Sequence, residues 1–226
     1  MLPIVAPPPC GLVLYDPTGV SFTGWTGQEE ANAVAARRDI PAGNVHPLPH
    51  VGCTPYLRSV VHNGNVIIIT HGNESTGFTT ATLRSDPSRR VGADVMVCLL
   101  ATAGLFANRS LPYRFELVIC GSASGHDTFA ARFHREVASR VPDVIVKAPV
   151  GLAEVSAGGE VSVTYFHLAS RTYADPLYAM ARTLGWAAMT PARALSNRFS
   201  RVPDTFVTRN NVLLHDWVYY PAGQSF

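Results

Sequence analysis

Four short runs of apolar, mostly β-branched residues stand out along the first two thirds of the chain. Each run stops at a glycine, a proline or a polar residue, and none shows the alternation of a strand with one wet face. Continuous apolar runs of this length are typical of strands buried on both sides in a parallel sheet. The predicted strands cover residues 11–15, 66–70, 115–119 and 144–146.

Segments with helical periodicity lie between these runs. Thr26 and Glu29 form a capping-box sequence that opens a helix running to about Arg38. Two more helices are predicted from about residue 94 to 108 and from about 127 to 140. Strands that alternate with helices predict an α/β fold, with helices on both faces of a mostly parallel sheet of about six strands.

The rest of the chain gives weaker patterns. Residues 40–64 are rich in proline, glycine and histidine, which predicts a loop with a short strand near 57–61. A hairpin is expected around Gly158 and Gly159. Asp175 and Pro176 open a further predicted helix, and residues 212–220 form a predicted last strand. We expect residues 1–10 to be an extended arm and residues 11–226 to be a single α/β domain with a C-terminal hairpin and helix addition.

Composition limits the possible partners. The chain has 226 residues, of which 47% are hydrophobic and 15% are charged, with a formal net charge of +2. A charge this small does not predict nucleic-acid or membrane binding, and we expect the doublet Arg37-Arg38 to be solvated. Lys147 is the only lysine. No signal peptide or membrane-spanning run is found, and four scattered cysteines predict a reducing compartment such as the cytoplasm.

Reactive side chains follow two of the predicted strands. His71-Gly72 comes after the strand at 66–70, and Cys120-Gly121 comes after the strand at 115–119. Because functional crevices of parallel sheets lie beyond the carboxyl ends of the strands, both groups are expected at one edge. We predict Cys120 as a nucleophile and His71 as its general base and acid, with the backbone N–H groups of Gly72 and Cys120 as the oxyanion hole.

The chain around these residues resembles the superfamily of cysteine peptidases that includes caspases, legumain and gingipains (clan CD). Cys120 is followed by small residues and a helix, then by an apolar strand ending in Ala148-Pro149-Val150-Gly151. This order is similar to that of caspase-like protease domains of bacterial toxins and effectors. The resemblance implies a three-layer caspase-like sandwich and peptide-bond hydrolysis by a metal-free His/Cys dyad, with a protein or peptide as substrate and often with self-processing. It also implies that the protein could be delivered into a target cell as an effector.

Substrate recognition is less clearly marked in the sequence. Asp16, Gly121, Ser122 and Asp127 follow predicted strands and are our candidate substrate-binding residues. Glu74 and Glu154 are two further acids that could reach a cationic substrate residue. The caspase sequence Gln-Ala-Cys-Arg-Gly is absent, so aspartate specificity does not follow.

Three other interpretations remain open. The chain could be a catalytically inactive caspase-like interaction module. It could instead be a nucleotide-binding α/β protein that uses the loop from Gly121 to Gly125, although the third glycine of a dinucleotide fingerprint is missing. His46, His50, Cys53 and the more distant His62 are potential zinc ligands, but their spacing fits no common zinc motif, and we predict no metal or cofactor.

Overall fold

The computed structural model describes residues 10–18, 24–72, 81–82, 90–123, 128–149, 152–164, 207–209, 212–214 and 217–220. The chain divides into two compact units. One consists of Met1–Val163 with Trp217–Phe226, and the other is Thr164–Asp216. In the second unit, the described strands are β10 (Val207–Arg209) and β11 (Val212–Leu214), which pair antiparallel.

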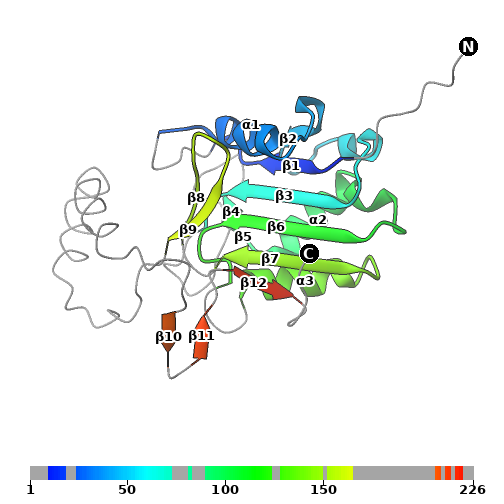
Figure 1. Cartoon of the computed structure of the whole chain (residues 1–226). Helices are drawn as coiled ribbons and strands as arrows, with labels where there is room; N and C mark the ends of the chain where they lie inside the picture. The colour runs from blue at the N-terminus through cyan, green and yellow to red at the C-terminus, as the bar shows by residue number, and fades with distance from the viewer. Residues whose placement is uncertain are drawn as a thin grey trace, which may run out of the picture. The chain divides into compact units, whose positions relative to one another are not determined.

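A six-stranded sheet forms the centre of the first unit, in the order β12-β7-β6-β3-β1-β2. Its strands are β1 (Leu12–Tyr15), β2 (Val45–Pro47), β3 (Asn65–Thr70), β6 (Tyr113–Ile119), β7 (Val144–Pro149) and β12 (Trp217–Tyr220). Only β12 runs antiparallel to its neighbour in this sheet, so the other five strands end at a common edge (Figure 1). The predicted mixed α/β fold with a mostly parallel sheet is confirmed.

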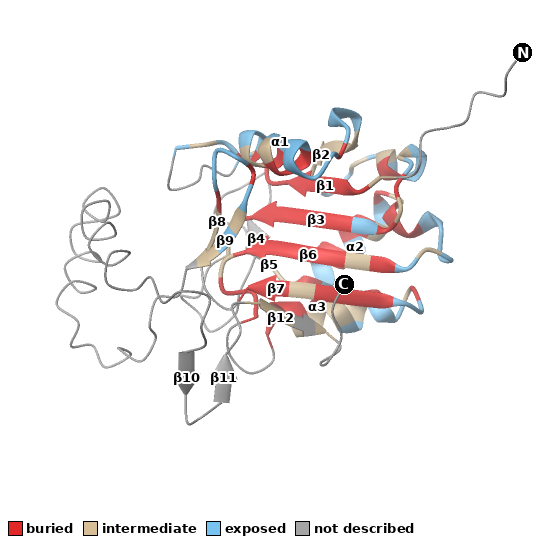
Figure 2. Ribbon diagram, in the orientation of Figure 1, coloured by how far each residue is buried: buried red, intermediate tan, exposed pale blue. Residues whose placement is uncertain are grey.

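Helices lie on both faces of this sheet, as the alternation of buried side chains along β3 shows. Ile67 and Ile69 pack in a cluster with residues of α1 (Gly27–Arg37). Val66 and Ile68 point the other way, into a larger cluster with α2 (Ala93–Thr102) and α3 (Phe129–Ala138). The strands are therefore buried on both sides over most of their length, which explains their continuous apolar runs (Figure 2).

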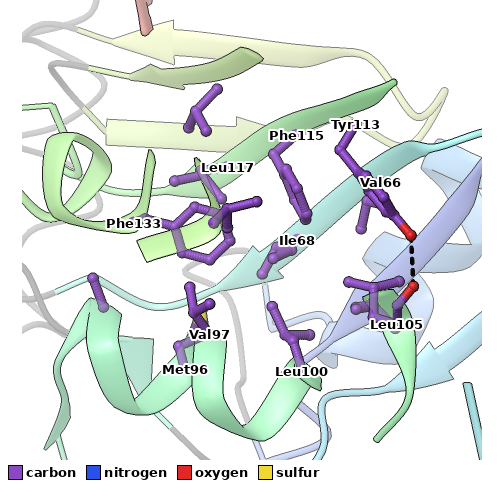
Figure 3. Packing of buried hydrophobic residues seen from close by; sticks show 14 of the residues in the cluster. Val66, Ile68, Met96, Val97, Leu100, Leu105, Tyr113, Phe115, Leu117 and Phe133 are labelled. Carbon is purple, nitrogen blue, oxygen red and sulfur yellow. Dashed lines mark hydrogen bonds between the residues drawn. The ribbon is translucent and has the colours of Figure 1, made fainter. Parts of the chain in front are cut away.

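Aromatic side chains form the centre of the larger cluster. The rings of Phe115 on β6 and Phe133 on α3 meet edge to face, with centroids 5.1 Å apart. Tyr113 is also fully buried, and its hydroxyl donates a hydrogen bond of 2.7 Å to the carbonyl oxygen of Leu105 (Figure 3). This bond satisfies the one polar atom of the ring and fixes the chain that follows α2.

Short elements complete the described chain. The 3₁₀-helices are η1 (Ala42–Asn44), η2 (Tyr56–Ser59) and η3 (Leu105–Ala107). β4 (Ala81–Thr82) pairs with β5 (Arg90–Val91). β8 (Leu152–Val155) and β9 (Val161–Thr164) make the predicted hairpin, whose turn is closed by a 2.9 Å hydrogen bond from the Ser156 N–H to the Glu160 carbonyl.

Some element boundaries predicted from the sequence are wrong. The segment at 57–61 is not a strand, because η2 occupies it, and the unpredicted strand β2 lies earlier, at Val45–Pro47. The helix predicted at 94–108 ends at Thr102, since Gly104 adopts a left-handed conformation with φ of 92°. The strand predicted at 212–220 is two strands, β11 and β12, of different sheets. The helix predicted from residue 175 lies outside the described residues.

No helix within the described ranges is both long and apolar enough to cross a membrane.

Candidate active site at the carboxyl edge of the sheet

The pairing of β3 with β6 brings His71 beside Cys120. The last pair of this parallel ladder is Thr70 with Ile119, so the next residue on each strand is the imidazole and the thiol, respectively. The backbone of Gly72 packs directly on that of Cys120. A Cβ atom on Gly72 would overlap the Cys120 carbonyl oxygen and lie 3.1 Å from its nitrogen. The structure thus gathers His71, Gly72 and Cys120 at one point of the edge.

The thiol of Cys120 lies on the α1 side of the sheet. Val118 belongs to the cluster on that side, and alternation assigns Cys120 to the same side. Its Sγ donates to the carbonyl oxygen of Ala153 on β8, at 3.7 Å, and Ala153 packs against the same cluster. The same alternation, continued one residue past the end of β3, predicts that His71 lies on this side as well. Both residues are half-buried.

The turn after Cys120 carries a buried hydroxyl without a hydrogen-bond partner. Gly121 has φ of 65°, and the Ser122 N–H donates back to the Ile119 carbonyl at 3.1 Å. Ser122 is fully buried, and its Oγ has no partner. Its carbonyl accepts from the Ala130 N–H at 2.9 Å, which fastens the turn to the first turn of α3. An unpaired buried hydroxyl is costly, so this oxygen is the polar group near Cys120 that most needs a partner.

Asp16 lies at the same edge, at the end of β1, and is almost fully buried. Its Oδ1 accepts hydrogen bonds from the N–H and the hydroxyl of Thr18, at 2.9 and 2.7 Å. Its Oδ2 accepts a bond of 3.3 Å from the Thr70 hydroxyl. Because Thr70 directly precedes His71, this carboxylate supports the strand end that presents the imidazole. Of the other acids considered, Glu154 lies on β8, while Glu74 and Asp127 fall outside the described residues.

An ion-pair network on β6 and β7 was not predicted. Arg38, at the end of α1, donates two hydrogen bonds of 2.6 and 3.0 Å to the buried carboxylate of Glu116. Lys147 donates a third of 3.2 Å, and its Nζ lies 4.2 Å from the centre of the Trp217 ring. Burial works against ionisation of Glu116, but the hydrogen bond from Arg38 and the charge of Lys147 outweigh it and hold the pKa of this carboxyl below its usual range.

Nothing in the sequence pairs Arg38 with Glu116, which is 78 positions away. The sequence suggested only that Arg37 and Arg38 are a solvated doublet. Both side chains are exposed as expected, but Arg38, at 37% exposure, also reaches from the helix to the sheet. Lys147, the only lysine of the chain, belongs to the same network through its hydrogen bond to Glu116.

The potential zinc ligands do not form a cluster. Among the residues that the structure describes, no three His, Cys, Asp or Glu side chains gather closely enough to hold a metal. The Nδ1 of His62 accepts a 3.1 Å hydrogen bond from the Gly64 N–H, so this imidazole supports a local turn.

A histidine and a cysteine that follow neighbouring strand ends, with the backbone amides of a glycine and of the cysteine at the same point, are residue types suited to nucleophilic attack on a carbonyl. The sequence matches no protein-family model, and no curated protein is significantly similar to it.

Proposed function

We propose that this chain is a cysteine endopeptidase with a three-layer caspase-like fold, in which Cys120 is the nucleophile and His71 the general base and acid. The observation that carries the proposal is the β3–β6 ladder, whose next residues on the two strands are His71 and Cys120. The sheet order and the helices on both faces agree with such a fold. The resemblance to toxin and effector proteases supports self-cleavage or cleavage of a partner protein as the biological reaction.

In the first half of the reaction, His71 takes the proton of Cys120 and the thiolate attacks the carbonyl carbon of the scissile peptide. The hydrogen bond from Sγ to the Ala153 carbonyl is lost at this step, because a thiolate has no proton to donate. Negative charge then develops on the peptide oxygen, where the N–H groups of Gly72 and Cys120 stabilise it. The imidazolium protonates the leaving amine, and an acyl-enzyme thioester remains.

In the second half, His71 removes a proton from water, which attacks the thioester. The tetrahedral intermediate collapses, the carboxylic acid product leaves, and the proton returns to the Cys120 sulfur. His71 acts as base and acid in turn, so no metal or cofactor is required for proton transfer.

The turn after the nucleophile supplies the candidate contacts to substrate. The Ser122 hydroxyl has no partner but is fully buried, so it can contact a substrate only when the turn opens, and Gly121 adds no side chain to this turn. The two carboxylate oxygens of Asp16 already accept three hydrogen bonds. This favours a role in supporting the strand end before His71 over direct contact with a cationic side chain of the substrate.

The test compares two cysteines of the same chain. Cys98 is a free, exposed thiol on α2 and serves as the internal reference for Cys120. We expect iodoacetamide to label Cys120 faster than Cys98 near neutral pH, and His71→Gln to remove the difference, as read by mass spectrometry of tryptic peptides. Cleavage of the chain itself, or of a peptide library, should stop in Cys120→Ala and continue in Cys98→Ala.

Full cleavage activity in Cys120→Ala would overturn the proposal. Absence of cleavage by the wild type, together with equal labelling of the two cysteines, would point to an inactive interaction module. A melting temperature raised by nucleotides, with no enhanced labelling of Cys120, would favour the nucleotide-binding interpretation instead.

A further inference from the structure

A hollow lined by arginines lies at the opposite edge of the sheet, where the parallel strands begin. Its volume is about 460 Å³, and its lining includes Arg58, Arg109 and Arg140. Arg58 is on η2, before β3; Arg109 precedes β6; and Arg140 follows α3 and precedes β7. His71 and Cys120 follow the other ends of β3 and β6, so this hollow, which we call the arginine cavity, is separate from the candidate active site.

The arginine cavity has an excess of positive charge. Its lining contains no acidic side chain. Arg140 forms an ion pair of 3.3 Å with Glu136, one turn back along α3. Within the described part of the chain, neither Arg58 nor Arg109 has a carboxylate within salt-bridge distance. With three arginines and one paired acid, about two positive charges are left unbalanced.

Hydrogen bonds to backbone carbonyls hold the walls of the arginine cavity. The Leu57 N–H donates a 2.9 Å hydrogen bond to the Ala103 carbonyl, and Leu57 is the buried residue of η2. On the other wall, the Tyr113 hydroxyl lies 2.7 Å from the Leu105 carbonyl (Figure 3). It also lies 3.2 Å from the Asn108 carbonyl. The segments bearing Arg58 and Arg109 are thus anchored before any ligand arrives, which reduces the entropy lost on binding.

We propose that the arginine cavity binds a small organic phosphate monoester in its dianionic form. A phosphate ester carries a charge of about −1.5 to −2 near neutral pH, which matches the excess charge of the cavity. Guanidinium groups suit its oxygens because they donate two parallel hydrogen bonds. Pro55 and Phe106 add apolar wall for the organic part, and the volume falls in the usual range for small-ligand sites. This proposal does not depend on peptidase activity.

Binding of phenyl phosphate to the full chain, measured by isothermal titration calorimetry, tests the ligand chemistry. The second ionisation of a phosphate ester has a pKa of about 6, so affinity should rise several-fold from about pH 5 to pH 7.5. Phenyl sulfonate keeps a single negative charge over this range and should bind more weakly, with no such rise. Equal affinity for the two probes, or no detectable binding of phenyl phosphate, would overturn the proposal.

Substitutions locate the site. Arg58→Gln and Arg109→Gln should each weaken phenyl phosphate binding by about tenfold, because each removes charge-assisted hydrogen bonds. Arg37→Gln removes the same charge from the exposed end of α1 and should leave affinity unchanged. An equal loss in Arg37→Gln would show that binding reflects net charge alone. Tighter binding of a phosphoserine peptide than of phenyl phosphate would contradict a small-molecule ligand and indicate a phosphorylated protein.

Discussion

The contact between the backbones of Gly72 and Cys120 leaves no room for a side chain at position 72. In Gly72→Ala the new Cβ must push the end of β3 away from the end of β6, because the atoms it meets are backbone atoms. We expect a loss of about 1–3 kcal/mol in the free energy of unfolding and a loss of the enhanced labelling of Cys120. Urea denaturation and iodoacetamide labelling measure the two effects.

Gly43→Ala is the matched control for this substitution. A Cβ on Gly43 would meet nothing within 4 Å, and the backbone there has no positive φ. Its stability should be unchanged or raised by a few tenths of a kcal/mol, since alanine restricts the unfolded chain. If both variants behave alike, the Gly72–Cys120 contact does not define the site.

The buried carboxylate of Glu116 makes a testable contribution to stability. Its pKa is lower in the folded chain than in the unfolded one, so ionisation favours folding at pH values above the unfolded pKa of about 4.3. Glu116→Gln should lower the free energy of unfolding by about 2 kcal/mol at neutral pH. The difference from wild type should shrink as pH falls through the lowered pKa, where the wild-type carboxyl also becomes neutral.

An exposed ion pair provides the comparison. Asp143 pairs with Arg114 at 3.0 Å, but its side chain is 57% exposed. Asp143→Asn should cost well under 1 kcal/mol, since solvent screens such pairs. Denaturant titrations from about pH 3 to pH 7 separate the two cases, and a pH-independent loss in Glu116→Gln would contradict the assigned role of its charge.

At the scale of elements, the local sequence pattern correctly predicted those helices and strands that depend on residues close together in the chain. The capping box at Thr26 and Glu29 is present and starts α1 one residue later. The apolar runs before His71 and Cys120 are β3 and β6, which is why the positions of these two residues could be predicted. In each case the signal lies within one turn or one strand.

Elements that depend on distant partners could not be predicted in this way. β2 is a strand because Val45 and His46 pair with Val13 and Leu14 of β1, more than thirty positions away. Its own sequence, Val-His-Pro, has no strand pattern. Likewise, β12 belongs to the central sheet because it pairs with β7, and local apolar character alone could not separate it from β11.

The start of α3 connects the turn after Cys120 to β12, the outermost strand of the sheet. The Thr128 Oγ accepts the Ala131 N–H at 3.1 Å and lies 3.0 Å from the Tyr220 hydroxyl on β12. Thr128→Ala and Thr26→Ala each remove a helix cap and should each cost about 1 kcal/mol in urea denaturation. Only Thr128→Ala should change the labelling rate of Cys120, since α3 is fastened to the turn after this residue. Equal labelling in both variants would show that the cap acts on stability alone.

At the scale of the whole first unit, the sheet separates two hydrophobic clusters that belong to different faces. Val34 of α1 packs in one cluster, and Phe115 and Phe133 pack in the other. Val34, Phe115 and Phe133 are all fully buried, so both clusters contribute to the stability of the same sheet. The arrangement allows coupling within a cluster to be distinguished from coupling across the sheet.

Double-mutant cycles measure this coupling. Phe133→Leu and Phe115→Leu remove two rings in edge-to-face contact, and their losses should depart from additivity by at least 0.5 kcal/mol. Phe133→Leu combined with Val34→Ala should be additive within about 0.5 kcal/mol, because the two residues share no cluster. Each single loss should be about 1–2 kcal/mol, small enough for the double variants to fold. Strong coupling between Phe133 and Val34 would mean that the sheet transmits changes from α3 to the face on which His71 and Cys120 lie.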